Sequence, residues 1–272
     1  MSIYTSRFIR FFLVLIILSF SSNVFSQTVI GARSVSLGQA NAALVGDRWA
    51  GFGNPALLQA NALNVSFYGI RNYGFVELTD YAATVSLPHK YGISALSFHR
   101  YGDDLFNETR IRGTYKNGFE NVHFGVTFNY SSLQFGDSFG SAGAFGVDVG
   151  IASELANGLW LGARATNINR PQYGDTDEDL VRELAVGLSY TLTDRAFFIA
   201  DVVKDVRFPT SFRGGIEIEL VDRVFARTGV STEPNTYSFG FGYKDVKWQF
   251  DLAVQQHTVL GLSPGIGFNV VF

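Results

Sequence analysis

The sequence contains no cysteine, one methionine and six prolines among 272 residues. Without cysteine there are no disulfide scaffolds, cysteine-ligated zinc or iron–sulfur sites, thiol catalysis or lipid-modified cysteine anchors. The formal net charge of -3 argues against nucleic-acid binding, which requires an excess of lysine and arginine on one surface. The chain is rich instead in Phe 26, Tyr 12 and Gly 29, a composition that favours strands and tight turns.

The first 26 residues have the composition of a secretory signal peptide. Arg7 and Arg10 precede an apolar run over residues 11–20, and small and polar residues follow it. This is the order of charged, apolar and cleavage regions in such signals, and we expect cleavage before Gln27. The alternative is a membrane anchor, but the apolar run is about half of the roughly 20 residues that a membrane-spanning helix needs.

From Leu63 onward, apolar residues fall at every second position, as in Val122, Phe124 and Val126. This two-residue period is typical of strands. The predicted strands are residues 62–72, 77–88, 91–101, 106–116, 121–134, 142–154, 158–169, 181–192, 196–204, 211–220, 223–231, 235–244, 246–257 and 262–272. Most have the length of roughly 9 to 11 residues that a tilted strand needs to cross a membrane, and their number is even, as in bacterial outer-membrane barrels.

The predicted connections alternate in length along the chain. Links after even-numbered strands are tight, as at residues 89–90 and 117–118, whereas the link over residues 170–180 follows an odd-numbered strand. Outer-membrane barrels have short periplasmic turns and longer external loops, so this alternation favours them over a soluble sandwich. The predicted fold class is therefore all-β, a 14-stranded antiparallel transmembrane β-barrel over residues 62–272.

Charged residues inside the predicted strands share one face, opposite the apolar stripe. They are Arg110, Arg112, Asp148, Arg164, Glu217, Glu219, Arg227 and Asp251. A lipid-facing arginine at the bilayer midplane would cost roughly 2–4 kcal/mol, so we expect these charges to face a polar lumen, paired or hydrated. The alternative is the solvated face of a soluble sheet.

Residues 27–61 differ from the rest of the chain because they are rich in alanine and glycine and lack strand alternation. Small residues permit close backbone packing, so we interpret this segment as a hatch that plugs the lumen, the alternative being a periplasmic tail. Within it, Asn54 and Pro55 are expected to shape the turn toward the first strand. Gly240 and Gly242 are interpreted as lumen-facing glycines that leave room for such a plug.

The hatch and one strand contain a recognisable set of residues. They are Gly31, Ala32, Arg33, residues 38–43, Asp47, Asn54, Pro55, Ala56 and Leu57, together with Gly162, Asn167 and Ile168. This set resembles the fourteen-stranded outer-membrane barrels related to the long-chain fatty-acid transporter FadL, and within them the PorV/PorQ group linked to type IX secretion. The resemblance implies a plugged barrel in the bacterial outer membrane.

Two functions follow from this resemblance. A PorV/PorQ-like protein would dock components of a secretion or surface-assembly system, whereas a FadL-like protein would admit small hydrophobic molecules. The charges predicted in the lumen argue against an apolar path and favour docking, and a purely structural barrel is a third alternative. The expected partners are outer-membrane lipid, secretion-system proteins or a hydrophobic small molecule, and the barrel-assembly machinery, with no nucleic acid.

No catalytic or metal-binding pattern stands out. The histidines are His89, His99, His123 and His257. No two of them have metal-ligand spacing, and we expect no enzyme activity, metal or cofactor. Asp175, Asp177 and Asp179 begin like a calcium loop, but Leu180 stands where that loop needs glycine. We therefore interpret them as part of a solvated external loop.

Phe272 ends the last predicted strand on an aromatic residue. This resembles the terminal signal that barrel-assembly machinery reads. We therefore predict that deletion of Phe272 lowers insertion into the membrane, and unchanged insertion would remove this role.

Overall fold

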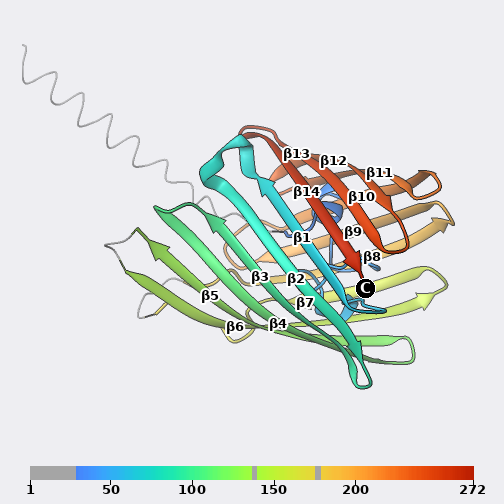
Figure 1. Cartoon of the computed structure of the whole chain (residues 1–272), viewed down its shortest axis with the longest axis horizontal. Coiled ribbons are helices and arrows are strands. Elements are labelled where there is room, and N and C mark those ends of the chain that lie inside the picture. The colour runs from blue at the N-terminus through green and yellow to red at the C-terminus, as the bar shows by residue number, and fades with distance from the viewer. Residues whose placement is uncertain (1–28, 137–139, 175–178) are drawn as a thin grey trace, which may run out of the picture.

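The structure is a computed structural model that describes residues 29–136, 140–174 and 179–272 (Figure 1). The predicted signal peptide, residues 1–26, lies outside the described residues. Within the described ranges, no helix is both long and apolar enough to cross a membrane.

The strands form one closed barrel in which each pairs antiparallel with its neighbours in sequence, and β14 pairs with β1. They are β1 (Asn64–Arg71), β2 (Thr79–His89), β3 (Gly92–Gly102), β4 (Phe106–Phe119), β5 (Val122–Phe135), β6 (Ser141–Ala156), β7 (Leu159–Ala165), β8 (Glu183–Thr193), β9 (Ala196–Asp205), β10 (Ser211–Val221), β11 (Val224–Thr232), β12 (Asn235–Lys244), β13 (Trp248–His257) and β14 (Gly261–Val271). The predicted 14-stranded fold is confirmed.

The two faces of the wall differ in the way that the alternation predicts. In β12, Tyr237, Phe239 and Phe241 are exposed on the outside, whereas Thr236 and Ser238 are buried on the inside. An apolar outer face opposite a polar lumen is the arrangement of transmembrane barrels, and the reverse of a soluble sandwich.

The connections divide the barrel into two ends. Those after even-numbered strands are tight turns, such as residues 90–91 and 120–121, and lie at what we call the turn end. Those after odd-numbered strands lie at the loop end, where residues 166–182 form the longest. The β1–β2 connection contains the 3-10 turns η2 (Asn72–Gly74) and η3 (Val76–Leu78).

β7 is shorter than the predicted strand over residues 158–169. After Ala165 the chain leaves the ladder, and Asn167 adopts a positive φ of 51°. Hydrogen bonds of Asn169 replace the missing strand: Val147 N donates to its Oδ1 at 2.9 Å, and its Nδ2 donates to Phe145 O at 2.7 Å. A side chain with one acceptor and one donor thus satisfies the exposed edge of β6, which periodicity alone does not predict.

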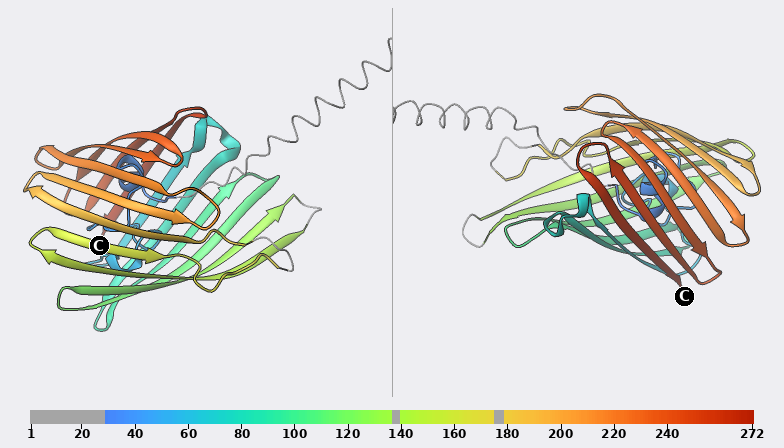
Figure 2. Two further views of the ribbon diagram at one scale, coloured as in Figure 1. Left: turned by 180° about the vertical axis from the view of Figure 1, so that it is seen from behind. Right: turned by 90° about the horizontal axis from the view of Figure 1, so that it is seen from above.

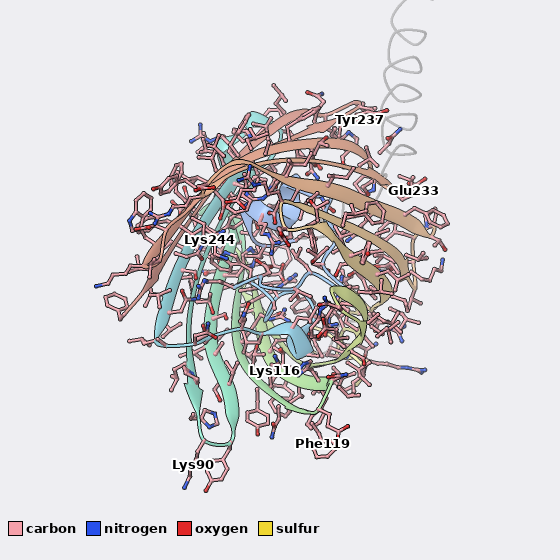
Figure 3. All side chains as sticks on the ribbon, turned by 90° about the vertical axis from the view of Figure 1, so that its right-hand side faces the viewer. Lys90, Lys116, Phe119, Glu233, Tyr237 and Lys244 are labelled. Carbon is pink, nitrogen blue, oxygen red and sulfur yellow. The ribbon has the colours of Figure 1, made fainter. Side chains whose placement is uncertain are left out.

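The hatch lies inside the barrel, where it appears in blue in Figures 2 and 3. It contains one short helix, α2 (Ala32–Ser36), and one 3-10 turn, η1 (Pro55–Leu57). Leu37 and Leu58 are fully buried, and α2 contacts β11 through β14 while η1 contacts β4 through β6. The apolar core therefore lies between hatch and wall, and side chains at the turn end, such as Lys90 and Phe119, project beyond it (Figure 3).

Glycines of the wall mark the path of the hatch. A Cβ added to Gly162 would overlap the carbonyl of Ala42, and one added to Gly229 would overlap the backbone of Gly38. Other wall glycines that face hatch backbone or side chains are Gly125, Gly150, Gly187, Gly215, Gly240 and Gly267. Because glycine lacks a side chain, these positions let the hatch backbone lie directly against the strands. Gly242 instead faces the guanidinium of Arg227.

Candidate functional site

Buried ion pairs attach the hatch to the wall through Arg33 of α2. Glu217 Oε1 accepts from Arg33 Nη2 at 2.8 Å, and Glu217 Oε2 accepts from Arg33 Nε at 2.9 Å and from Arg227 Nε at 2.5 Å. Arg227 Nη1 donates to Asp251 Oδ1 at 2.6 Å. We call Arg33, Glu217, Arg227 and Asp251 the hatch cluster. Glu217 lies between Arg33 and Arg227, and Asp251 pairs with Arg227, which offsets the cost of burying these charges.

Two further side chains hold the hatch backbone. Asn54 Nδ2 donates to Ala42 O at 2.7 Å and to Ile151 O at 3.1 Å, and its Oδ1 caps η1 by accepting from Ala56 N at 3.1 Å. On the opposite side, the Asp201 carboxylate accepts from the backbone amides of Asn41 and Ala42 at 2.6 and 2.8 Å. The turn predicted at Asn54 and Pro55 is thus tied to β6 as well as to the hatch.

Asp47 is a buried hatch carboxyl, 5% exposed, that takes no part in the hatch cluster. Burial raises its pKa to about 6, while the nearby Arg33 guanidinium and the Trp49 backbone amide limit that rise. The charge on folded Asp47 therefore changes around pH 6, where the neutral carboxyl becomes a buried anion.

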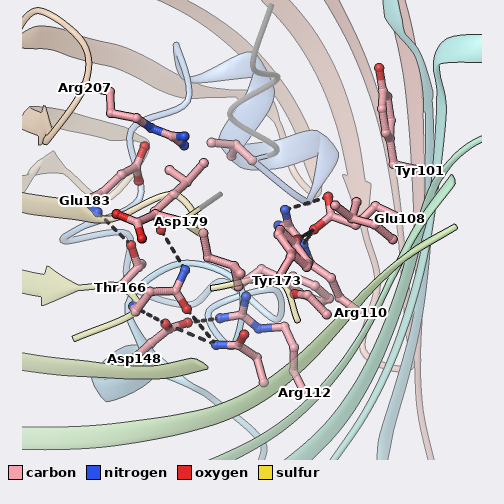
Figure 4. Close-up of a pocket in the computed structure, with 18 of the residues that line it drawn as sticks. Tyr101, Glu108, Arg110, Arg112, Asp148, Thr166, Tyr173, Asp179, Glu183 and Arg207 are labelled. Carbon is pink, nitrogen blue, oxygen red and sulfur yellow. Dashed lines mark hydrogen bonds and ion pairs between the residues drawn. The ribbon is translucent and has the colours of Figure 1, made fainter. Parts of the chain in front are cut away.

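A cavity of about 350 Å³ opens at the loop end, above the hatch (Figure 4). Hatch residues Asn41 and Phe52 border it from below, and residues after β7 border it from the side. Strands β4 and β5 contribute a continuous wall. We call it the loop-side cavity, and its volume lies at the small end of the range of about 300–1,000 Å³ for ligand pockets.

The loop-side cavity is aromatic at its mouth and polar at its floor. Phe106 pairs with Phe135 at the loop end, with ring centroids 5.3 Å apart. Arg112 pairs with Asn129 six residues deeper along the same two strands, about 20 Å away at 3.3 Å per residue. Leu133 lies between the two ends. Two phenylalanine rings thus stand at the mouth, and Arg112 and Asn129 lie next to the hatch.

The charges at the floor and wall of the cavity occur in pairs (Figure 4). Glu108 accepts from Arg110 Nε at 2.7 Å and Nη2 at 2.8 Å. Arg164 Nη2 donates to Glu183 Oε2 at 2.8 Å, and Arg112 pairs with Asp148. Neutralisation within these pairs lowers the cost of placing charges in a partly apolar cavity.

Tyr173, in the connection after β7, closes one side of the cavity. Its hydroxyl donates to Glu108 Oε1 at 2.7 Å, and burial raises the pKa of this hydroxyl well above its ordinary value. The hydroxyl therefore stays protonated at neutral pH and remains a donor. Tyr173 thus occupies an acceptor site on Glu108 that a ligand would otherwise use.

The structure separates the charges predicted for the lumen into two groups. Arg110, Arg112, Asp148 and Arg164 line the loop-side cavity, and Glu217, Arg227 and Asp251 belong to the hatch cluster. Glu219 is only partly buried and lies near the turn end, where it accepts from Arg223 N at 2.8 Å.

Sequence reasoning missed several carboxylates on the inner face, among them Glu108, Glu183 and Asp201. Glu108 could have been found, because it precedes Arg110 by two residues and therefore shares its face. Glu183 stands at the start of a strand, where the alternation gives little guidance. The bonds of Asp201 to the hatch backbone carry no signal in the sequence.

The remaining candidates give no second site. Among residues 29–136, 140–174 and 179–272, no group of three or more His, Asp or Glu is placed to hold a metal ion. Asp179 lines the cavity, while Asp175 and Asp177 lie outside the described residues.

Phe272 is 74% exposed and its amide donates to Leu63 O at 2.9 Å. Its role in barrel assembly stays a prediction.

No known sequence family matches the chain, and no curated protein does either. Solved structures do match it. A deltaS2 mutant of the TodX monoaromatic hydrocarbon channel has 13% identity and a TM-score of 0.67, over 91% of this chain and 100% of that chain. The CymD monoaromatic hydrocarbon channel has 12% identity and a TM-score of 0.64, over 92% and 99% of the chains.

A FadL homologue from Pseudomonas aeruginosa has 11% identity and a TM-score of 0.56, over 88% of this chain and 96% of that chain. At these identities the similarity establishes the architecture alone. The resemblance to the PorV/PorQ group receives no support from these comparisons. The chain therefore has the fold of the FadL-like outer-membrane barrels.

Proposed function

We propose that the protein is a channel of the bacterial outer membrane that admits small, mainly apolar molecules from the loop end into the cavity above the hatch. The observation that carries this proposal is the loop-side cavity itself. It is concave, opens at the loop end and has aromatic and aliphatic residues at its mouth, which are the features of small-molecule sites.

The similar solved structures support this cargo class. Two of them are described as monoaromatic hydrocarbon channels and a third as a FadL homologue, and all have TM-scores above 0.5. The hatch fits the same function, because it fills the lumen below the cavity and so prevents a continuous aqueous pore. Lipid surrounds the apolar outer face in this proposal, and the barrel-assembly machinery inserts the protein.

The charged lumen is less of an obstacle to apolar cargo than the sequence alone suggests. Arg110, Arg112 and Arg164 each have a carboxylate partner, so the wall exposes dipolar pairs rather than isolated charges. The rings of Phe106 and Phe135 lie at the mouth, where cargo would enter, and Leu133 lies below them.

Uptake by cells tests this proposal. We expect cells that produce the protein to accumulate radiolabelled toluene several-fold faster than cells that lack it. Val181→Trp fills the cavity and should abolish the difference, whereas Val186→Trp, on the outer face, should leave it intact. Equal uptake with and without the protein, for a correctly inserted barrel, would refute the channel function.

A second candidate function is docking of a secretion or surface-assembly system, as the PorV/PorQ resemblance implies. The observation that favours it is the firm attachment of the hatch through Arg33 and Glu217, since a docking platform has no need to open. Affinity purification from gently solubilised outer membrane, with mass spectrometry of proteins and lipids, tests it. Stoichiometric secretion components would support docking, and bound hydrophobic molecules alone would support the channel.

A further inference from the structure

The carboxylates of the loop-side cavity have few acceptor sites left for a ligand. Asp148 accepts from Arg112, from Asn129 Nδ2 at 3.3 Å and from Asn167 N at 2.8 Å. Glu108 accepts two bonds from Arg110 and one from Tyr173. Protein donors thus already occupy both oxygens of each of these two carboxylates.

The arginines of the same cavity keep unused donors. Arg112 is 7% exposed, and its Nε is buried with no acceptor among the described residues. Only its Nη2 donates, to Asp148. In Arg110 and Arg164, likewise, Nη1 makes no hydrogen bond within the part of the chain that the structure describes. Arg112 Nη1 also makes no hydrogen bond among the described residues and, unlike Nε, is not fully buried. The Nη1 groups of these arginines are therefore the donors that a ligand oxygen could use.

Phe52 of the hatch fixes the orientation of Arg112. The Arg112 Cζ atom lies over the Phe52 ring, 5.0 Å from its centroid, which is within the range of a cation–π contact. A planar guanidinium presents its N–H groups in one plane, which suits the two oxygens of a carboxylate. The polar floor is therefore prepared for an acceptor, not for a donor or a hydrocarbon.

The space above Arg112 limits the rest of the ligand. Leu133 lies four residues toward the loop end from Asn129, the partner of Arg112, which is about 13 Å along the strand. Leu133, Leu180 and Tyr173 form one buried apolar cluster at this height. The cavity has a volume of about 350 Å³, and the rings of Phe106, Phe135 and Tyr173 line it, which suits an aromatic body.

We propose that the loop-side cavity binds a compact aryl-alkyl carboxylate, with the carboxylate on Arg112 and the ring directed toward Leu133 and Tyr173. This inference rests on the proposed channel function and names its cargo more closely. A hydrocarbon of the same shape would leave the Arg112 Nη1 donors without an acceptor. An amine would place a cation beside arginines whose partner carboxylates are already occupied.

Competition binding in phospholipid nanodiscs tests this assignment, with radiolabelled 3-phenylpropionate as the probe. The competitors are n-propylbenzene, which lacks the carboxylate, 3-phenylpropylamine, which reverses the charge, and decanoate, which replaces the ring with a chain. We expect 3-phenylpropionate to compete at least tenfold better than each of them. Arg112→Met should weaken its binding about tenfold and leave n-propylbenzene unchanged. Arg195→Met, in an exposed turn, is the matched control and should change neither.

The outcomes separate this inference from the function on which it rests. Equal or stronger binding of n-propylbenzene or decanoate would overturn the carboxylate assignment while the channel stands. Binding and toluene uptake that are both absent would overturn the two together. Should Arg112→Met fail to fold, the four probes on the unmodified protein still decide the matter.

Discussion

Arg33 and Arg112 are both buried arginines inside the same barrel, yet their surroundings differ. Every side-chain nitrogen of Arg33 donates, two to Glu217 and one to Val45 O. Arg112 uses one nitrogen, Nη2, and its Nε has no acceptor in the described chain. An arginine whose side-chain nitrogens all donate within the protein holds one part of the protein to another. An arginine with unused donors can bind a partner that comes from outside.

The same contrast extends to the two ends of the lumen. The hatch cluster joins α2 to β10, β11 and β13 of the wall, and its charges are matched within the protein. The loop-side cavity keeps open space and spare donors above the hatch. The lumen thus divides into a part that holds the plug and a part that is suited to receive cargo.

The largest expected effect comes from the centre of the hatch cluster. Glu217→Gln removes the carboxylate shared by Arg33 and Arg227, and leaving buried charges without a partner costs about 3–5 kcal/mol. We expect the free energy of unfolding in urea, measured in lipid vesicles, to fall by this amount. Glu219→Gln, two residues along the same strand, should change it by less than about 1 kcal/mol, and equal effects would contradict the difference between the two sites.

The next effect depends on pH and concerns Asp47. Its folded pKa of about 6 lies above the ordinary 3.8, so the folded state binds this proton more tightly than the unfolded state does. The stabilisation present below pH 4 is therefore lost as pH rises to about 6, a change of about 3 kcal/mol for a shift of two units.

Asp47→Asn should remove this part of the pH dependence. The test is to measure the free energy of unfolding of both proteins at pH 4, 5, 6 and 7. We expect their difference to change by about 3 kcal/mol across this range in favour of the variant at high pH. Parallel pH curves for the two proteins would show that Asp47 does not titrate in this way.

A smaller effect is expected where the hatch touches the wall. Gly162→Ala places a Cβ against the carbonyl of Ala42, and overpacking of this kind costs about 1–3 kcal/mol. The measured quantity is the temperature at which the fast-migrating folded barrel converts to the slower unfolded form on a gel. Gly113→Ala meets nothing within 4 Å and serves as the control. Similar losses in both variants would mean that the effect belongs to strand propensity and not to the hatch.

The smallest effect compares the two arginines directly. Lysine keeps the charge but cannot donate from several nitrogens at once, so Arg33→Lys loses more bonds than Arg112→Lys. With each hydrogen bond worth about 1 kcal/mol, we expect Arg33→Lys to destabilise the protein by about 1 kcal/mol more. Chemical unfolding under identical conditions measures this difference, and a greater loss in Arg112→Lys would reverse the comparison.

Much of the fold was predictable because the membrane imposes a strict pattern. Lipid outside and water or hatch inside force apolar and polar residues to alternate, as at Phe239, Gly240 and Phe241, so strands can be located one by one. Boundaries were less predictable. The end of β7 depends on Asn169, whose side chain bonds replace a strand pair in a way that no periodicity reveals.

The candidate site was predictable only in part. Alternation assigns Arg112 and Asp148 to the inner face, but it does not show that they pair, since they lie 36 residues apart. Arg33 and Glu217 are separated by 184 residues, and the nine strands β1 to β9 lie between them in the chain, so only the closed barrel brings them together. The ligand preference of the cavity depends on which hydrogen-bond donors remain without an acceptor, and this is known only once the strands of the wall are assembled.

The glycine positions along the wall have a consequence for the order of events during biogenesis. Backbone contacts at Gly125, Gly162 and Gly229 leave no clearance between hatch and strands, and the hatch crosses much of the circumference. A segment packed this closely against the wall cannot enter the lumen after β14 has paired with β1 and closed the barrel. The hatch therefore has to pack against the strands while the sheet is still open, and the sheet then closes into a barrel around it. Protease protection of the hatch should accordingly precede heat-resistant barrel closure in a time course of insertion.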